Sequence, residues 1–283
     1  MYKLRAGLSL SSISGLGFID GEYRYSVRPT LKDSIIKSME AGFDTVDIGI
    51  SGVYTATLLS QMIDEVIPVV KETGVKVSGI HFPFNSPWMD FATPYENDRV
   101  EIVKFIIKMF DKLAPLSPDV FVFHPGGQGC TASNKEIVFD NLCKSAEELS
   151  LATDKTVCFE NMVRSNVVET VDQAVALLEN APHLSWVLDV NHLLHDKPED
   201  AILKIGKRIK HLHISDYDFI NERHLLPGDG LIDWMKVIGN LEKVGYNGVF
   251  NYEVSLAKRG YTIKDAKDNF DKLFSDYNSL KSK

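Results

Sequence analysis

The chain has 283 residues, of which 44% are hydrophobic and 25% charged, an ordinary composition for a globular protein that buries one large core. Its formal net charge of −8 disfavours binding to nucleic acid or to an anionic membrane surface. The three cysteines show no C-x-x-C spacing, and no run approaches the ~18 apolar residues of a membrane span. These features predict a soluble cytoplasmic protein.

Short apolar, β-branched runs recur along the whole chain and predict β-strands. Amphipathic stretches separate them, which indicates that strands alternate with helices. The predicted strands are Leu4–Leu10, Thr45–Ile50, Val75–His81, Asp119–His124, Thr156–Glu160, Leu184–Val190, Ile209–Ser215 and Gly248–Val254.

Two segments between these strands carry signals for the start of a helix. Thr93-Pro94-Tyr95-Glu96 and Ser133-Asn134-Lys135-Glu136 both fit a capping box, in which a hydroxyl and a carboxylate satisfy end amides reciprocally. Pro94 would then occupy the first helical position. Apolar residues at helical spacing follow within 103–113 and recur within 237–244, and Gly245 is expected just beyond the end of the second helix.

Eight strands alternating with helices predict an α/β fold, a (β/α)₈ TIM barrel that forms one domain over residues 1–283. A doubly wound open sheet is the competing fold, and it more often carries a Gly-rich turn after its first strand. Ser14-Gly15-Leu16-Gly17 is too loose a match to that turn, so the barrel is favoured.

Polar residues end most of the later strands, and in a barrel the carboxyl ends of the strands form the active-site face. Carboxylates and imidazoles are ligands for divalent metals, and a buried charge cluster needs a cation to be tolerated. The set predicts a metal site. It comprises His81, His124, Glu160, Asp189, His192, His211, His213 and Glu253.

Taken singly, several of these residues also fit a structural role. His211 and His213 share strand parity, and His213 is the better ligand because it lies nearer the carboxyl end of its strand. The long polar loop Asp216–Gly230 brings Arg223 and His224 within reach of a substrate or merely caps the barrel. Trp88 either lines the pocket or packs its loop.

Several stretches that contain these strand-end residues resemble the xylose isomerase-like TIM barrel superfamily. This superfamily includes sugar phosphate isomerases and epimerases and the related endonuclease IV-type enzymes. The likeness extends over nearly the whole chain through the eight-strand layout. The stretches are Phe159-Glu160-Asn161, Leu188-Asp189-Val190-Asn191-His192, His211-Leu212-His213-Ile214-Ser215-Asp216, the segment Arg223 to Gly230, and Tyr252-Glu253.

The resemblance implies one divalent metal ion (Mn, Co, Mg or Zn) held by Glu160, Asp189, His213 and Glu253. It also implies that Glu160 and Glu253 act as an acid/base pair and that His192 contacts the substrate. We extend the substrate-binding set to His81, His124, Asn161, Arg223, His224 and Trp88. Members of the superfamily often form homodimers or homotetramers.

The leading hypothesis is a sugar or sugar phosphate isomerase or epimerase that transfers a proton through a metal-stabilised enediolate. A dehydratase or lyase acting on a keto-polyol or keto-acid would share the first proton abstraction.

A third hypothesis is a trinuclear-zinc phosphodiesterase of the endonuclease IV type, although that branch has aspartate where this chain has Glu222. The loops Ser51–Thr57, Pro83–Pro94 and His192–Pro198 contain one lysine, Lys197, and no arginine, which disfavours DNA as a partner. A metal-free binding protein is the fourth hypothesis.

Overall fold

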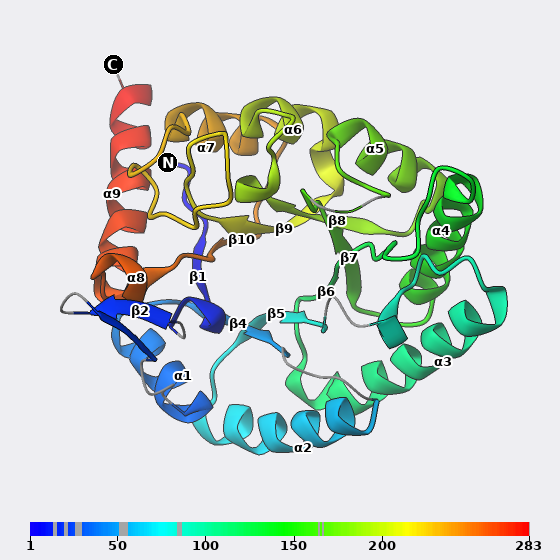
Figure 1. The fold of residues 1–283 in the computed structure, drawn as a ribbon. Coiled ribbons are helices and arrows are strands. Elements are labelled where there is room, and N and C mark those ends of the chain that lie inside the picture. Colours follow the sequence, from blue (N-terminus) through cyan, green and yellow to red (C-terminus); the bar gives the residue numbers. More distant parts are fainter. Residues whose placement is uncertain are drawn as a thin grey trace.

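The computed structural model describes residues 1–13, 16–19, 22–25, 30–50, 56–83, 87–163, 165 and 167–282. Eight parallel strands close into a barrel in the order β1-β10-β9-β8-β7-β6-β5-β4 (Figure 1). Each predicted strand lies within two residues of an observed one at either end, which confirms the (β/α)₈ prediction. The barrel strands are β1 (Arg5–Ser9), β4 (Thr45–Gly49), β5 (Val77–His81), β6 (Val120–Phe123), β7 (Thr156–Glu160), β8 (Ser185–Asp189), β9 (Ile209–Ile214) and β10 (Val249–Tyr252).

Helices surround the barrel in a ring (Figure 1). They are α1 (Leu31–Glu40), α2 (Ala56–Thr73), α3 (Glu96–Leu113), α4 (Lys135–Leu151), α5 (Val171–Asn180), α6 (Pro198–Ile205), α7 (Trp234–Lys243), α8 (Leu256–Arg259) and α9 (Ile263–Lys281). Short 3₁₀ turns supplement them at η1 (Leu10–Ile13), η2 (Pro87–Met89), η3 (Ala114–Leu116), η4 (Val190–His192) and η5 (Gly206–Arg208). An unpredicted antiparallel ribbon, β2 (Leu16–Ile19) with β3 (Glu22–Tyr25), lies beside α8.

Side chains alternate between the barrel interior and the helix layer, as the period of a strand requires. On β6, Val120 and Val122 belong to a small cluster that is separate from the main core, whereas Phe121 and Phe123 belong to the main core. Phe121 stacks on Phe110 of α3 with ring centroids 4.5 Å apart. The barrel interior and the helix–strand layer are therefore two distinct packed regions.

Both predicted capping boxes are wrong, although both helices exist. Helix α3 begins at Glu96, two residues later than predicted, because the Thr93 hydroxyl accepts from the backbone of Tyr95 and not from residue 96. The Glu96 carboxylate is bound by Arg99 of the same helix. Helix α4 begins at Lys135 after Asn134, and its first turn has no side-chain cap.

The other helix predictions are confirmed. The apolar stripe of α3 within 103–113 faces the protein core, and Gly245 follows α7 with a positive φ of 76°.

All three cysteines are free, and Cys158 is fully buried. Among helices in the described part of the chain, none is long and apolar enough to cross a membrane. Ser14 and Gly15 of the weak glycine motif lie outside the described residues.

Candidate metal centre

Four predicted ligands meet at the carboxyl end of the barrel. Three lie on adjacent strands, and the fourth directly follows the next strand. Glu160 ends β7, Asp189 ends β8, His213 lies near the end of β9, and Glu253 follows β10. The strand register places Asp189 opposite His213. One ligand atom from each of the four residues lies within 4.8 Å of the others. The structure therefore brings together the four residues that the sequence analysis predicted as a metal-binding set.

His213 is central in this group. Its Nδ1 lies 3.0 Å from Oε1 of Glu160 and 2.9 Å from Oε2 of Glu253. The Glu160 side chain is only 1% exposed, whereas that of Glu253 is 25% exposed. The two glutamates thus differ in their access to solvent, and Glu253 borders the open side of the cluster.

Three further histidines surround the Glu160 carboxylate. His81 at the end of β5 and His124 just after β6 approach Oε2 at 3.1 and 3.4 Å. His192 in η4 lies 3.3 Å from Oε1 and 3.2 Å from Asp189 Oδ2. The prediction that these three imidazoles converge on the strand-end face is confirmed.

The two glutamates remain ionised in this environment. Burial alone would raise the pKa of Glu160, but the charge of His213 and hydrogen bonds from His124 and His192 hold it well below its usual range. Burial likewise opposes ionisation of Glu253, yet the adjacent His213 lowers its pKa to about 2. Both side chains are therefore available as ligands or bases at neutral pH.

The pKa values of three neighbouring groups are raised. Burial, with the charges of Glu160 and Glu253, raises the pKa of Asp189 well above its usual range. Burial disfavours the charged form of His192, but Asp189 and Glu160 raise its pKa to about 10. The same two glutamates raise the pKa of His213 against the effect of burial. These shifts favour bound protons in a cluster whose donor atoms suit a divalent ion.

Two asparagines brace the site. The Asn161 amide donates to the Asp189 carbonyl at 2.7 Å, and its oxygen accepts from the Asp189 backbone N–H at 3.0 Å. Asn191 accepts from the backbone N–H groups of Arg223 and His224, which ties the loop after β9 to the end of β8. Asn161 was predicted to bind substrate, but the structure engages its amide with backbone.

The remaining predicted substrate residues lie at different distances from the cluster. His224 Nδ1 donates to the Glu253 carbonyl at 3.1 Å, and the His224 ring stands edge-on to His192. Arg223 is 45% exposed and binds Asp218 at 2.7 Å. Trp88 packs edge-on against Phe105 of α3, so its observed contact is with the core.

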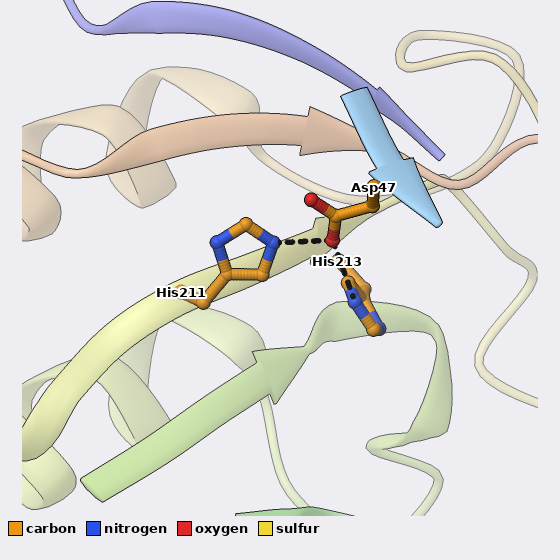
Figure 2. A group of neighbouring side chains, drawn as sticks. All are labelled: Asp47, His211 and His213. Carbon is orange, nitrogen blue, oxygen red and sulfur yellow. Dashed lines mark hydrogen bonds and ion pairs between the residues drawn. The ribbon is translucent and has the colours of Figure 1, made fainter. Parts of the chain in front are cut away.

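The sequence analysis missed Asp47 on β4. Its carboxylate is buried inside the barrel and contacts both histidines of β9, as Figure 2 shows. The available signal was a charged residue in the middle of the apolar strand Thr45-Val46-Asp47-Ile48. Its partner His211, predicted to be the poorer ligand of the two histidines, places Nε2 2.7 Å from Asp47 Oδ2.

A closed (β/α)₈ barrel with carboxylates and imidazoles gathered at the carboxyl ends of its strands defines the class of this protein as a TIM barrel with a candidate metal centre. The model of the xylose isomerase-like TIM barrel family matches residues 36–273, and the chain belongs to that family.

Two relatives in sequence are an uncharacterised protein and an epimerase. The chain is 26% identical over 236 residues to an uncharacterised protein of Methanocaldococcus jannaschii, which covers 79% of each chain. It is 27% identical over 111 residues to the D-psicose 3-epimerase of Enterocloster bolteae, across 38% of this chain and 35% of the epimerase. The crystal structure of a D-psicose 3-epimerase from Clostridium cellulolyticum H10 superposes with a TM-score of 0.73 and 16% identity, over 98% of this chain and 99% of the other.

Proposed function

We propose that this protein is a divalent-metal-dependent epimerase or isomerase of a sugar or sugar phosphate. The observation that carries the proposal is the convergence of Glu160, Asp189, His213 and Glu253 within 4.8 Å. Family membership and the resemblance of the fold to a D-psicose 3-epimerase support it.

The four residues fit a hard divalent cation. Three carboxylates and one imidazole form a donor set suited to Mn²⁺, Mg²⁺, Co²⁺ or Zn²⁺. The Asp189 Oδ2 atom is buried and accepts no hydrogen bond within the described residues, although the His192 ring lies 3.2 Å away as an ion-pair partner. A buried carboxylate oxygen without a hydrogen bond is costly, and a bound cation would provide a further partner. When bound, the cation would supply a Lewis acid that acidifies the C–H next to a substrate carbonyl.

Glu160 and Glu253 are the proposed acid/base pair. One carboxylate would remove the proton from the carbon, and the other, after taking a proton from solvent, would return it to the opposite face. Both have lowered pKa values and are therefore in the ionised form that can take up a proton at neutral pH. Glu253 is the more exposed and would exchange its proton with solvent during turnover.

The surrounding polar side chains would bind and orient the sugar. His192 and His224 lie beside the cluster, while His81 and His124 line its other side around Glu160. Arg223 would hold a distal hydroxyl or phosphate after leaving Asp218. Trp88 would form part of the outer wall, and Asn161 would hold Asp189 in place.

The first test is the metal content of protein purified without chelator or metal-affinity resin, measured by elemental mass spectrometry. We expect one divalent ion per chain. The metal-loaded protein is then incubated with a panel of ketoses and ketose phosphates in D₂O, and products are analysed by NMR. Deuterium in an epimerised or isomerised sugar is expected.

Replacing either base by its amide isolates the acid/base pair. Glu160→Gln and Glu253→Gln should each lower kcat by about 10²–10⁴, because each removes one proton-transfer group. Glu179→Gln, an exposed carboxylate change on α5, is the matched control and should retain full activity. Wild-type turnover without solvent deuterium in the product would contradict the mechanism.

A dehydratase or lyase reaction would start with the same proton abstraction at the same site. The D₂O experiment separates the two, because a dehydratase product has lost one water from the substrate mass.

The observation favouring the phosphodiesterase hypothesis is the presence of two further sets of potential ligand groups beside the first. His192, Glu222 and His224 offer ligand atoms within 4.8 Å, as do His81, Glu160 and His213. About three zinc ions per chain would favour that reaction, and cleavage of abasic DNA would then be assayed.

A further inference from the structure

A polar layer lies inside the barrel directly beneath the candidate metal centre. Asp47 of β4 is 2% exposed, and its Oδ2 atom faces two histidines of β9 (Figure 2). His211 Nε2 lies 2.7 Å from this oxygen, and His213 Nε2 lies 3.6 Å from it. The same carboxylate oxygen therefore joins a buried histidine to the central residue of the ligand cluster.

The layer is built to hold this carboxylate in one position. The Ser78 hydroxyl donates to Oδ1 at 2.5 Å, and the Asn251 amide donates to Oδ2 at 3.1 Å. Residue 79 is glycine, and a Cβ there would lie only 2.6 Å from Oδ2. The hydrogen bonds come from β5, which neighbours β4, and from β10, and the close approach to β5 is possible only because residue 79 has no side chain.

Packing alone does not explain this arrangement. A buried carboxylate is costly to desolvate, and apolar residues of similar volume commonly stabilise an interior as well or better. The opposite wall of the same interior is apolar, since Val120, Val122, Cys158 and Val187 form a separate hydrophobic cluster there. A charged group on one wall of an interior whose opposite wall is apolar indicates a role toward the residues above it.

The two nitrogens of His213 point to different partners. Nδ1 faces Glu160 and Glu253 at 3.0 and 2.9 Å, whereas Nε2 faces Asp47. A metal-binding imidazole offers the lone pair of one nitrogen, and a carboxylate that accepts the N–H of the other nitrogen fixes the ring and its tautomer. Nδ1 is the nitrogen that faces the proposed ligands Glu160 and Glu253, whereas Nε2 faces Asp47.

We propose that Asp47, anchored by His211 and Asn251, is a positioning residue that holds His213 with Nε2–H toward Asp47 and Nδ1 toward the cation. This inference rests on the proposed metal-dependent function. By this inference, the barrel interior contributes to metal affinity in addition to the strand-end residues.

The test compares Asp47→Asn with Ser78→Ala in Mn²⁺ binding by isothermal titration calorimetry. Both changes disturb the same buried hydrogen-bonded layer, but only the first removes the charge facing His213. We expect Asp47→Asn to raise the Kd for Mn²⁺ by about 10–100-fold, as is typical for partners of metal-binding histidines, and Ser78→Ala to change it far less. The absorption spectrum of bound Co²⁺ should shift in Asp47→Asn and stay unchanged in Ser78→Ala.

An unchanged Kd in Asp47→Asn would overturn the inference, and so would equal losses in both variants, since they would indicate general disturbance of the interior. A wild-type protein that binds no Mn²⁺ would refute the proposed function together with this inference. If Asp47→Asn does not fold, long-range ¹H–¹⁵N NMR of the Zn²⁺-loaded wild type decides. A His213 proton on Nε2 supports the proposal, and a proton on Nδ1 overturns it.

Discussion

Replacing Asp189 by asparagine should abolish metal binding without destabilising the metal-free protein. Burial and the charges of Glu160 and Glu253 raise the pKa of Asp189 well above its usual range, which favours the neutral acid in the metal-free cluster. Asparagine copies the shape of this neutral acid. It cannot, however, become the carboxylate that a cation requires.

The magnitude follows from the geometry of the cluster. Ligand atoms of Asp189 and Glu160 lie within 4.8 Å, and two unit charges at this separation repel by about 3.5 kcal/mol at an effective dielectric constant of about 20. The metal-free protein avoids this repulsion by protonation, so Asp189→Asn should leave its stability within about 1 kcal/mol of wild type. For wild type, cation at 100 times its Kd adds about 2.7 kcal/mol.

The assay is differential scanning calorimetry with EDTA and with saturating Mn²⁺. At about 2–4 °C per kcal/mol, wild type should gain about 5–10 °C in Tm on metal addition, and Asp189→Asn should gain none. Asp218→Asn, a change outside the cluster, should keep the wild-type gain. A full metal-induced gain in Asp189→Asn would refute the reasoning, as would a large loss of metal-free stability.

Three further outcomes are expected. Because Asp189 and His213 hold protons in the metal-free cluster, Mn²⁺ affinity measured by calorimetry should rise with pH, about tenfold per unit for each displaced proton. His192 has a folded pKa of about 10 against 6.5 for the ordinary group, so its stabilising charge is fully present below pH 6.5 and is lost toward pH 10. The Tm of the metal-free protein in EDTA should therefore fall over that range. Gly79→Ala should lower the free energy of unfolding in urea by about 1–3 kcal/mol, because its Cβ would lie 2.6 Å from a carboxylate oxygen of Asp47. The control is Gly49→Ala on β4, whose Cβ would have nothing within 4 Å.

Much of the fold could be predicted because strand periodicity is a strong local signal. Each buried strand is a short apolar run bounded by polar residues, and a parallel barrel repeats that pattern. The β2–β3 ribbon escaped prediction although Asp20-Gly21 between its strands is a common hairpin dipeptide. Helix starts were less predictable, because Thr93 and Glu96 each had a competing partner nearby.

The convergence of the proposed ligands could be predicted because strand ends of a barrel converge on one face whatever the loops do. The contact of Asp47 with the second ring nitrogen of His213 could not be predicted in this way. Asp47 and His213 are separated by most of the barrel sequence, and only the closed topology places their strands across the same interior. In the sequence, the only sign of such a contact is a charged residue inside an apolar strand.

The loop after β9 shows how a prediction can locate function without describing its geometry. Its polarity and length pointed to His224, but not to the backbone that presents it. His224 has a positive φ of 47°, which is uncommon for a residue with a side chain. Asn191 holds its N–H, and a bridge between Asp216 and Leu225 fixes the following residue. The Asp216 carboxylate in turn accepts from Trp234 and Gly228, which closes the loop on α7. Strained backbone persists only where surrounding contacts enforce it, so these contacts have a consequence at the site: they place the His224 ring against Glu253 and His192.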